Sequence, residues 1–516
     1  MKKCLGFTLP TLFLFFSAIS CTNPLRDNIT DIVEYANQKR VDCELRDGCG
    51  IAADTVIEIT YFILMDTESL VLTGTMAEEA EVRWEEKEHS TFGVMTNIVY
   101  IQPKTVWSDN GEHTLSASCA DRENGYIFEV DRTFGILDGA VYVSKSGYNT
   151  NSGRIDNPLD NIADACKLAR AIYPDIPGIE IRVAEGEYAG YVEEYIPSSI
   201  TRDDTNDPIY LKNGQHLLGG WSPDFSVRDP EQYPTIINGH NTETEKGNAV
   251  YMIPGTQETV VDGFTLLGHK LGSDSTIMSL PPGDLSSSSL VIQNNTIIAY
   301  TGRAVYVKTE PGSTCEIINN KIFSWSDNAD DIYLEVGESL LSDNIINSYG
   351  YFKDSSKGEK SAISMYDSEG IIEKNEINMG QQTVADSSGI SLIYSNAVIR
   401  NNVIDAGIGP QSIGISNISS SPVICNNTIY VGSGTREVYG TESEAIAIKN
   451  DHTWYTPESK SNPVIQNNLM LATGENYGSH TLLFVAGSGC EAAEFSYNTY
   501  SNFASGLPTD MVTNGE

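Results

Sequence analysis

The sequence predicts an all-β protein in which most of the chain coils into a β-helix, a solenoid of parallel strands. Two observations predict the solenoid: a short apolar strand ending in a polar residue and Asn recurs eight times, and a second short strand recurs between most copies. A third observation, several strand-like segments between polar turns ahead of the repeats, predicts a separate β-sandwich. Self-similarity at a period in the twenties indicates units that stack because none buries its apolar face alone.

The repeated phrase fixes the period and the type of secondary structure. Its copies read LVIQNNTII, CEIINNKIF, LLSDNIINS, IIEKNEINM, AVIRNNVID, PVICNNTIY, PVIQNNLML and EFSYNTYSN, with aligned residues Asn295, Asn320, Asn344, Asn375, Asn402, Asn427, Asn468 and Asn498. The intervals between these Asn residues are 25, 24, 31, 27, 25, 41 and 30 residues. The apolar pieces are short and alternating, which favours strands over helices. Leucine-rich repeats share this period but need a dense Leu framework and a helical return. Here the fixed position is Asn following β-branched residues, which favours a β-helix.

The second recurring strand predicts the inside of each coil. Its clearest copies are RAVYV (303–307), SAISMY (361–366), GISLIY (389–394), SIGIS (412–416) and EAIAIK (444–449). Apolar residues such as Ile390 and Leu392 lie two apart, so they point to the same side of a strand. The interior of the solenoid is therefore expected to be aliphatic.

The repeated Asn is interpreted as a structural ladder. Asn tolerates left-handed backbone angles at a tight corner, and its amide can bond to the Asn above and below. The alternative reading treats the sequons at 294–297 and 426–428 as glycosylation acceptors. Both sequons fall on the phase of the repeat, and the N-terminus is of a bacterial type, which favours the ladder.

These phrases resemble right-handed parallel β-helix proteins of the pectin-lyase-like superfamily, especially bacterial surface lipoproteins that carry the uncharacterised module DUF1565. The resemblance covers residues 139–516. It begins with VYVSKSGYNTNSGRIDNPLDNIADACKLARAIYPDIPGIEIRVAEGEY, similar to the opening strand, turn, capping helix and second strand of that family, and continues through 217–241 and 260–268. The resemblance implies a fold but no particular activity, because one fold hosts many activities.

The capping helix can also be argued from its residues. Asn157 is a suitable N-cap and Pro158 fits the first helical position. An apolar stripe follows, formed by Ile162, Ala165, Cys166, Ala169 and Ile172. Pro174 ends the helix because it disfavours the helical conformation at the preceding residue. Such a helix would cover the open first coil of the solenoid.

The N-terminus predicts export. Lys2 and Lys3 precede an apolar run, and AISC ends at Cys21, so residues 1–20 resemble a lipoprotein signal peptide with Cys21 as the lipid attachment site. Ala18 departs from the Leu usual at that position, and an ordinary cleaved secretory signal is the alternative. We expect a bacterial outer-membrane or cell-surface protein that contacts a membrane through its N-terminal lipid.

Two further segments precede the solenoid. Residues 21–51 are polar and mixed, as expected of a lipidated tether, and Cys43 and Cys49 bracket a short loop whose length allows a disulfide in an exported protein. Residues 52–138 contain the strand-like segments of the predicted sandwich, and NGEHTLSASCADRENG resembles the late strands of bacterial immunoglobulin-like domains. We therefore expect a small Ig-like domain there, and a β-helix over 139–516.

The charge limits the classes of ligand. The formal net charge is −38, and removal of residues 1–20 takes away two Lys residues and no acid. Phosphate binding needs a basic surface, so nucleic acid is not expected as a partner. The same charge disfavours direct capture of polyanions such as polygalacturonate unless calcium bridges them.

Enzymes of the superfamily that the chain resembles cleave acidic polysaccharides with calcium-bound carboxylates and an Arg or Lys base, or with clustered Asp residues. Asp327, Asp330 and Asp331 are three carboxylates within five positions, which suits a hard cation such as Ca²⁺, although their order matches no EF-hand loop. Arg303, Arg400 and Lys449 are candidate lyase bases, and each also fits a solvated side chain on a strand or turn. The Asn-Thr-Asp, Gly-His-Gly and Arg-Ile-Lys phrases of a polygalacturonase are absent from the sequence.

Three functions follow from this reading. The first is a non-enzymatic, lipid-anchored surface protein whose β-helix binds a polysaccharide or a host or matrix protein, with Trp325, Tyr333 and Tyr366 as aromatic contacts that equally fit packing roles. The second is a calcium-dependent polysaccharide lyase or hydrolase. The third is a structural component of the envelope with no ligand.

Overall fold

The structure is a computed structural model of the 516-residue chain. It describes residues 41–88 (except 44 and 46), 95–108, 111–172, 178–189, 209–239 (except 213), 248–268 (except 254), 275–279, 288–326, 329–349, 359–381, 386–409, 411–432, 444–451, 461–473, 479–485, 494–501 and 503. Residues 1–20 and Cys21 lie outside this range, so the predicted signal peptide and lipid site are not described. Within the described residues, no helix combines the length and the apolar character needed to span a bilayer.

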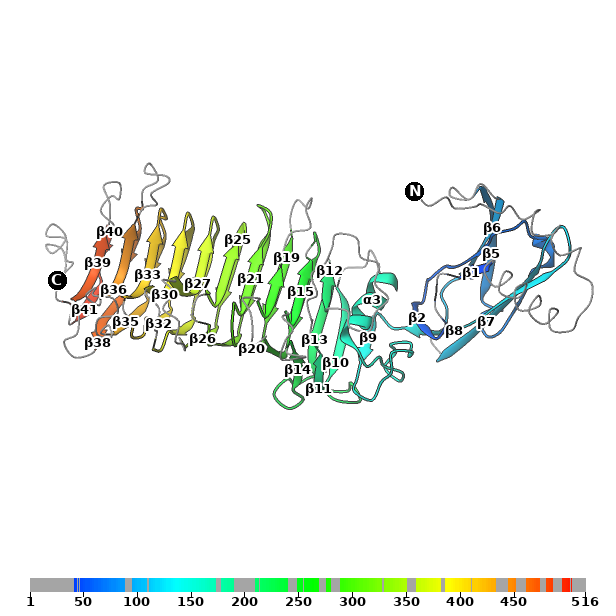
Figure 1. Ribbon diagram of the computed structural model, residues 1–516, viewed down its shortest axis with the longest axis horizontal. Helices are drawn as coiled ribbons and strands as arrows, with labels where there is room; N and C mark the ends of the chain where they lie inside the picture. The colour runs from blue at the N-terminus through cyan, green and yellow to red at the C-terminus, as the bar shows by residue number, and fades with distance from the viewer. Residues whose placement is uncertain are drawn as a thin grey trace, which may run out of the picture. The chain divides into compact units, whose positions relative to one another are not determined.

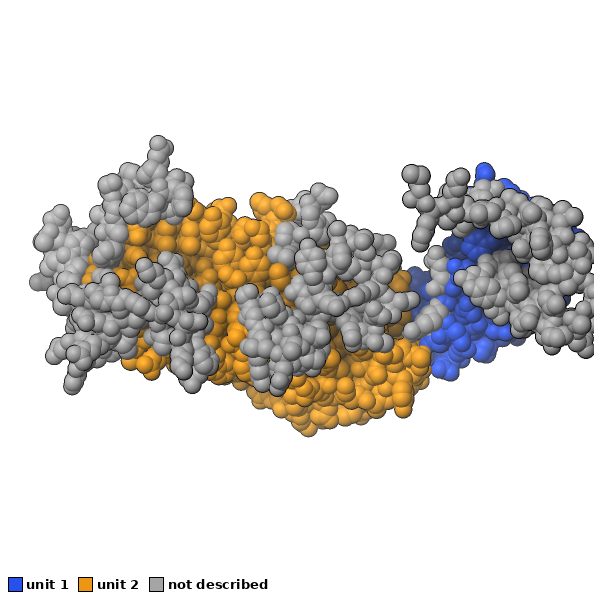
Figure 2. Space-filling view, viewed as in Figure 1, with its two compact units in different colours: residues 1–136 blue, residues 137–516 orange. Residues whose placement is uncertain are grey.

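The chain forms two compact units, Met1–Ile136 and Leu137–Glu516 (Figure 2). The first unit contains two four-stranded antiparallel sheets. One has the order β1 (Val41–Cys43), β3 (Ile57–Tyr61), β6 (Met95–Pro103) and β5 (Ala80–Glu88). The other has the order β2 (Cys49–Ala52), β8 (Ile127–Leu137), β7 (Glu112–Ala120) and β4 (Val71–Thr73), and a short 3-10 helix, η1 (Thr67–Ser69), precedes β4. Buried residues such as Ile59, Val99 and Phe134 form its core.

The end of the expected tether differs from the prediction. Strand β1 falls within 21–51 and β2 begins there, so the polar composition hid two short edge strands. The predicted disulfide is also not formed, because Cys43 is a free and buried thiol. Cys43 ends β1 in one sheet and Cys49 begins β2 in the other, so the two cysteines belong to different sheets. Burial raises the pKa of the Cys43 thiol.

The second unit is a parallel β-helix built from three long sheets (Figure 1). The twelve-strand sheet runs β9 (Ala140–Val143), β10 (Ile179–Ala184), β13 (Gln215–Trp221), β16 (Glu258–Asp262), β19 (Ser289–Gln293), β22 (Thr314–Ile318), β25 (Glu338–Ser342), β28 (Glu369–Glu373), β31 (Asn396–Arg400), β34 (Val423–Cys425), β37 (Val464–Gln466) and β40 (Glu494–Ser496). From β10 onward, successive strands of this sheet are three apart in chain order, because each coil contributes one strand to each sheet.

The eleven-strand sheet runs β11 (Gly186–Ala189), β14 (Thr235–Asn238), β17 (Phe264–Leu267), β20 (Thr296–Ala299), β23 (Lys321–Ser324), β26 (Ile345–Ser348), β29 (Glu376–Asn378), β32 (Val403–Asp405), β35 (Thr428–Gly432), β38 (Leu469–Thr473) and β41 (Thr499–Ser501). The ten-strand sheet runs β12 (Tyr210–Lys212), β15 (Val250–Ile253), β18 (Ile277–Ser279), β21 (Val305–Lys308), β24 (Ile332–Glu335), β27 (Glu359–Tyr366), β30 (Asp386–Ile393), β33 (Gln411–Ile418), β36 (Glu444–Asp451) and β39 (Ser479–Val485).

In-register pairing explains the aliphatic core. One inward row of the twelve-strand sheet, whose members are fully buried, is Ile181, Leu217, Val261, Ile292, Ile317, Leu341, Ile372, Ile399, Ile424 and Ile465. The pairs noted in the sequence, such as Ile390 with Leu392, are likewise completely buried. A slip of one residue would turn every such row outward, so burial fixes the register.

The eight repeated Asn residues form one continuous ladder inside the corner between the twelve-strand and eleven-strand sheets. In each step the backbone N–H and the side-chain amide of one Asn donate to Oδ1 of the next, from Asn295 to Asn498. The seven members from Asn295 to Asn468 are at most 2% exposed. Every amide therefore has partners on both sides although it lies away from water.

The left-handed corner residue is not the ladder Asn, as the sequence reading proposed, but the residue before it. Positive φ angles of 53° to 58° occur at Asn294, Asn319, Asp343, Lys374, Asn401, Asn426, Asn467 and Tyr497. The two roles are therefore split between neighbours: the first residue turns the chain, and the second bonds along the axis. This split explains why many copies contain two consecutive Asn residues, because Asn tolerates left-handed angles better than most residues.

A second ladder, formed by Ser, lies at another corner. The backbone N–H donates to the next Ser Oγ from Ser288 to Ser313, from Ser368 to Ser395, from Ser395 to Ser420 and from Ser420 to Ser461. Each of these Ser residues stands seven positions before a ladder Asn, as in 368 and 375 or 395 and 402. The residues before three of them, Asp367, Tyr394 and Ser419, have positive φ angles, so both corners use the same design.

A helix covers the first coil. Helix α3 (Ile162–Ile172) packs on β9, β10 and β12, with Ala165, Cys166 and Ala169 fully buried. Its predicted N-cap, Asn157, is wrong: Asn161 Oδ1 accepts the N–H groups of Ala163 and Asp164. Residue 161 fits the capping role because it immediately precedes the helix, whereas Asn157 closes a turn back to Arg154.

Candidate functional site

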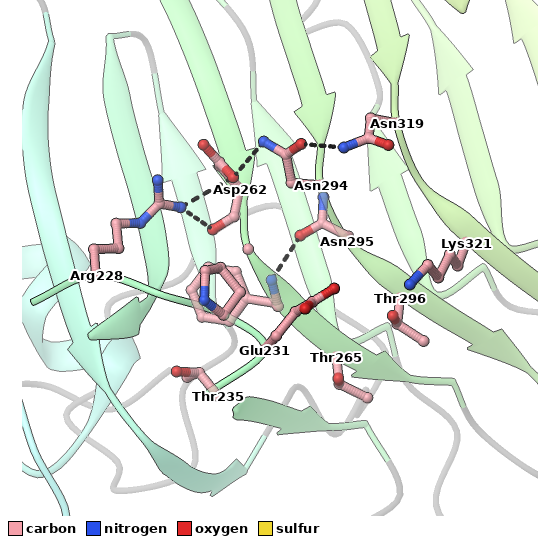
Figure 3. Close-up of a pocket in the computed structure, with 13 residues that line it drawn as sticks. Arg228, Glu231, Thr235, Asp262, Thr265, Asn294, Asn295, Thr296, Asn319 and Lys321 are labelled. Carbon is pink, nitrogen blue, oxygen red and sulfur yellow. Dashed lines mark hydrogen bonds and ion pairs between the residues drawn. The ribbon is translucent and has the colours of Figure 1, made fainter. Parts of the chain in front are cut away.

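A shallow pocket of about 360 Å³ lies on the outside of the β-helix, across four neighbouring coils. Its lining residues come from the turn after β13, from the end of β16 and the start of β17, and from the two following coils: Arg228, Pro230, Glu231, Thr235, Asp262, Gly263, Phe264, Thr265, Asn294, Asn295, Thr296, Asn319 and Lys321. Figure 3 shows Arg228 and Asp262 along one side, Asn294 and Asn319 along the next, and Lys321 at the opposite end. Pockets of this size are large enough to hold part of a small ligand.

The turn after β13 forms the first wall of the pocket. Asp224 holds this turn by accepting hydrogen bonds from the hydroxyls of Ser222 at 2.6 Å and Ser226 at 2.8 Å. These bonds, first that from Ser222, lower the pKa of Asp224 to about 2. Phe225 takes a left-handed conformation and buries its ring edge-on against Tyr142 at 4.9 Å between centroids. The turn is therefore anchored by both charge and packing.

Gly263 permits this turn to approach the sheet. Its φ is +82°, and a Cβ built there would lie 2.8 Å from Arg228 Nη2 and 3.0 Å from Pro230 Cγ. Any side chain at this position would push the guanidinium away from the sheet. The requirement for Gly is thus steric as well as conformational.

Asp262 is the centre of the polar network. It is only 5% exposed, and its Oδ1 pairs with Arg228 Nη2 at 3.0 Å and accepts the Asn294 amide at 3.0 Å. Its Oδ2 accepts Gln293 Nε2 at 3.0 Å. Arg228 also donates to the Gly219 and Asp262 carbonyls, which fixes the guanidinium plane. Because both carboxylate oxygens are occupied, Asp262 orients its neighbours and is poorly placed to exchange a proton with a ligand.

The network continues to the rim of the pocket. Asn319 Nδ2 donates to Asn294 Oδ1 at 2.7 Å, so the two amides are held in a fixed orientation (Figure 3). Asn294 and Asn319 are exposed left-handed corner residues, and the buried ladder residue Asn295 accepts the Phe264 N–H beneath them. The pocket is thus built on the Asn corner itself.

The floor of the pocket is an outward row of the eleven-strand sheet. Thr265 on β17 pairs in register with Thr296 on β20, which pairs with Lys321 on β23. Lys321 is exposed and the two Thr residues are half-buried. Two cationic side chains, Arg228 and Lys321, and two carboxylates, Asp262 and Glu231, therefore line a surface with no excess of either sign.

The predicted cation site differs from what the structure shows. Asp331 is fully buried and points into the solenoid, where it pairs with Lys360 at 3.5 Å. Burial raises its pKa, and Lys360 is the main group that opposes this shift. Asp330 accepts the Ser361 N–H at 2.9 Å, and burial raises its pKa to about 6. Asp327 lies outside the described residues, and no group of three metal-binding side chains occurs among those described.

The three candidate bases are not brought together. Arg400 on β31 pairs with Glu373 at 2.7 Å, and Lys449 on β36 lies 3.8 Å from Asp451. Arg303 precedes β21 and places its guanidinium 5.2 Å and 5.0 Å from the ring centroids of Tyr306 and Tyr333. Each base therefore has its own local partner on a different part of the solenoid.

The candidate aromatics stack on neighbours in adjacent coils. Trp325 lies between Tyr300 and Tyr349, with centroid distances of 5.9 Å and 6.0 Å. Tyr333 stacks on Tyr306 at 5.3 Å. Tyr366 meets Tyr394 edge-on at 5.8 Å and remains 37% exposed. Stacking along the axis occupies ring faces, so these side chains mainly support the coils.

Sequence reasoning missed the pocket residues, although a signal was present. The phrases at 217–241 and 260–268 predict early coils of the solenoid. They contain Gly219, Gly220 and Gly263 close to the charged residues Arg228 and Asp262, and such glycines indicate a close backbone approach. The pairing of those two charges needs the stacking of coils and is not visible in the sequence.

Comparison with known proteins gives one family match. Residues 145–348 match a family described as "Protein of unknown function (DUF1565)". This segment includes α3 and every residue that lines the pocket, but it is less than half of the chain. No curated protein matches the chain.

Two solved structures are similar over most of their length. The first is the catalytic domain of a GH87 alpha-1,3-glucanase in complex with nigerose, with 11% identity, coverage of 88% of this chain and 90% of that chain, and a TM-score of 0.32. The second is a substituted form of a GH87 alpha-1,3-glucanase catalytic domain with nigerose, with 10% identity, coverage of 90% and 96%, and a TM-score of 0.27. At these values the likeness implies nothing about the activity of this chain.

Proposed function

We propose that this chain is an exported surface protein whose β-helix binds a carbohydrate in the pocket around Asp262. The observation that supports the proposal most strongly is the preformed network of Arg228, Asp262, Asn294 and Asn319 at the edge of that pocket. Fixed amides and charged groups cost little entropy when a ligand binds, because their rotamers are already ordered.

The chemistry of the lining favours a hydroxyl-rich, uncharged ligand. Amides offer both donors and acceptors, Thr265 and Thr296 offer hydroxyls, and the opposite charges of Lys321 and Glu231 balance. A phosphorylated ligand would meet Asp262 and Glu231 in a chain of net charge −38. A sugar, by contrast, can exchange hydrogen bonds with the amides, hydroxyls and Lys321 ammonium of the lining.

The proposal is tested with the exported chain on an array of neutral and uronic-acid glycans, followed by titration of any glycan that binds. Replacing Asn319→Ala or Lys321→Ala should weaken binding about tenfold, the effect expected for one lost hydrogen bond to a polar ligand. Asn401→Ala is the matched control, because Asn401 is also an exposed left-handed corner residue but lies away from the pocket. Equal affinity for all three variants would exclude this pocket.

The alternative function is cleavage of an acidic polysaccharide by a lyase or hydrolase. The same glycans, incubated with the chain in the presence of calcium or a chelator, would then yield fragments detectable by mass spectrometry. Calcium-dependent fragments with an unsaturated end would replace binding by lyase activity as the function. The occupied oxygens of Asp262 favour binding, because a catalytic carboxyl must be available to the substrate.

We also propose that Cys21 carries a lipid after removal of residues 1–20, and that the first unit is an Ig-like stalk. The supporting observations are the apolar run before AISC and the two antiparallel sheets of Met1–Ile136. Incorporation of a labelled fatty acid tests the anchor. Label that persists in the Cys21→Ser variant would show that lipid, if present, is attached elsewhere.

A further inference from the structure

A Lys and an Asp face each other inside the hydrophobic interior of the β-helix. Lys360, in β27, and Asp331, directly before β24, both have fully buried side chains, and Lys360 Nζ lies 3.5 Å from Asp331 Oδ1. Strands β24 and β27 belong to adjacent coils that pair in register, and the Asp331 N–H donates to the Ser361 carbonyl at 2.9 Å. The backbone therefore holds the two side chains against each other.

An enclosed ion pair of this kind is costly. Each charge loses its hydration, and the mutual attraction offsets that loss only when geometry and additional hydrogen bonds are favourable. Here Lys360 Nζ also donates to the Ser326 carbonyl, and the hydroxyls of Ser324 and Ser348 lie near Asp331. Burial still raises the pKa of the Asp331 carboxyl, which favours its neutral acid form.

From this enclosed geometry we propose that Lys360 and Asp331 become joined by an isopeptide bond between Nζ and Cγ. One proton passes from the Lys360 ammonium to the Asp331 carboxylate, and the neutral Lys360 nitrogen then attacks the carboxyl carbon of Asp331 and forms the C–N bond. One C–O bond of the carboxyl breaks, and its oxygen leaves as water together with the two protons released by the ammonium group. Atoms and charge balance without any oxidant or co-reactant, since an ammonium and a carboxylate become one neutral amide and one water.

The surroundings favour this condensation. Holding the two groups in place makes the reaction intramolecular, and effective concentrations in such cases reach about 10⁵–10⁸ M. The neutral acid is the form of Asp331 that a nucleophile can attack, and Ser324 and Ser348 can donate to the oxygen that gains charge. The product removes two buried charges from the core. This inference is independent of any carbohydrate ligand.

Peptide mapping of the whole chain, purified from the producing cells, reduced and denatured, tests the bond. Trypsin would normally release residues 322–353, which contain Asp331, and would cleave after Lys360 to release 361–374. With the bond present, cleavage after Lys360 fails, and 322–353 appears joined to 358–374 with a mass one water below the sum of the two peptides. We expect this branched peptide to replace the two linear ones.

The Lys360→Arg variant is the control, because it keeps the positive charge and the tryptic site but lacks the amine. Its digest should contain both linear peptides and no branched one. Fragmentation of the branched peptide must place the link on Asp331. Complete cleavage after Lys360 in the unsubstituted chain, with 322–353 at its full mass, would overturn the proposal, as would a link at Asp330. The measurement on the unsubstituted chain does not depend on whether the variant folds.

Discussion

At the scale of single residues, each coil depends on two neighbouring corner residues with different tasks. Asn402 is 1% exposed and accepts both the backbone and the side-chain N–H of Asn375 through Oδ1. Its own amide donates to the Ile372 carbonyl and to Asn427 Oδ1. Removing such a side chain leaves buried donors and acceptors unpaired, and these cost more than the bond itself contributes.

We therefore predict that Asn402→Ala lowers the free energy of unfolding by about 3 kcal/mol, the sum of two orphaned buried groups. The measurement is a urea titration followed by circular dichroism. Asn396→Ala is the control, because Asn396 is exposed and its Oδ1 accepts a hydrogen bond from the exposed N–H of Ser421. Similar losses in the two variants would contradict a special contribution of the buried ladder.

The left-handed corner offers a stabilising substitution. Lys374 has φ of 55°, a conformation that costs an ordinary L-residue roughly 1 kcal/mol, while five equivalent positions carry Asn. We predict that Lys374→Asn raises the free energy of unfolding by about 0.5 kcal/mol, because Asn adopts this conformation more readily. Its contact with Glu373 at 3.5 Å is half-exposed, so its loss has little effect.

The comparison with Lys374→Ala separates the two effects. Alanine removes the contact with Glu373 but keeps the backbone cost, so its unfolding midpoint should equal or fall below that of the unsubstituted chain. If Lys374→Ala stabilises as much as Lys374→Asn, the gain comes from removing the Lys side chain and the backbone argument is wrong.

At the scale of elements, helix α3 protects the first coil. The helix buries Ala169 completely, Arg170 Nη1 donates to the Tyr210 carbonyl at 2.8 Å, and Gln215 Nε2 donates to the Cys166 carbonyl at 2.9 Å. These bonds connect α3 to β12 and β13, beyond the strand β9 that ends the twelve-strand sheet. A sheet end without such a cover is a site for association with other chains.

We predict that Ala169→Glu detaches α3 and makes the protein aggregate. A carboxylate placed in this fully buried position loses its hydration, and an uncompensated buried charge costs about 3–5 kcal/mol. Light scattering and size-exclusion chromatography measure the outcome. Ala171→Glu on the exposed face of the same helix should leave the protein monodisperse, and aggregation of both variants would point to charge rather than to loss of the cover.

The elements also show how far the sequence could predict the structure. The spacing of the repeat predicts the Asn ladder and the inward residues such as Ile390 and Leu392, and the structure contains both. The prediction is possible because equivalent positions in successive copies pair with one another. The Ser ladder was overlooked because Ser is common in this chain, although its seven-residue interval to the ladder Asn is regular. Strand β1 was missed because a three-residue edge strand with one buried side chain has almost no periodic signal.

The pocket and the buried Lys360–Asp331 pair could not be predicted from the sequence, because both depend on how the coils stack. Asp262 and Arg228 are 34 positions apart, and only the stacking of coils brings them to 3.0 Å. Asp331 belongs to the acidic phrase that predicts a cation site, yet the fold turns it inward toward Lys360. Charged residues in a solenoid therefore cannot be assigned to a face by composition alone, because one position separates the inside from the outside.

At the scale of the whole molecule, the chain combines two units with separate cores. The first unit buries Ile59, Val99 and Phe134 within its two antiparallel sheets, and the second buries its aliphatic rows within three parallel sheets. Within a solenoid each coil contacts only its neighbours, so its cooperativity arises from coil-to-coil interfaces. We therefore expect the antiparallel sheets of the first unit and the solenoid of the second to unfold at different temperatures.

We predict two transitions in differential scanning calorimetry, each assignable by a substitution in one core. Asn402→Ala should lower only the transition of Leu137–Glu516, and Ile59→Ala should lower only that of Met1–Ile136, because Ile59 is fully buried in β3. If either substitution moved both transitions together, the two units would unfold as one cooperative body. The unsubstituted chain could also show one transition that becomes two in each variant. That result would mean that the two units unfold independently but at the same temperature, because a substitution can shift one transition alone only when the cores melt separately.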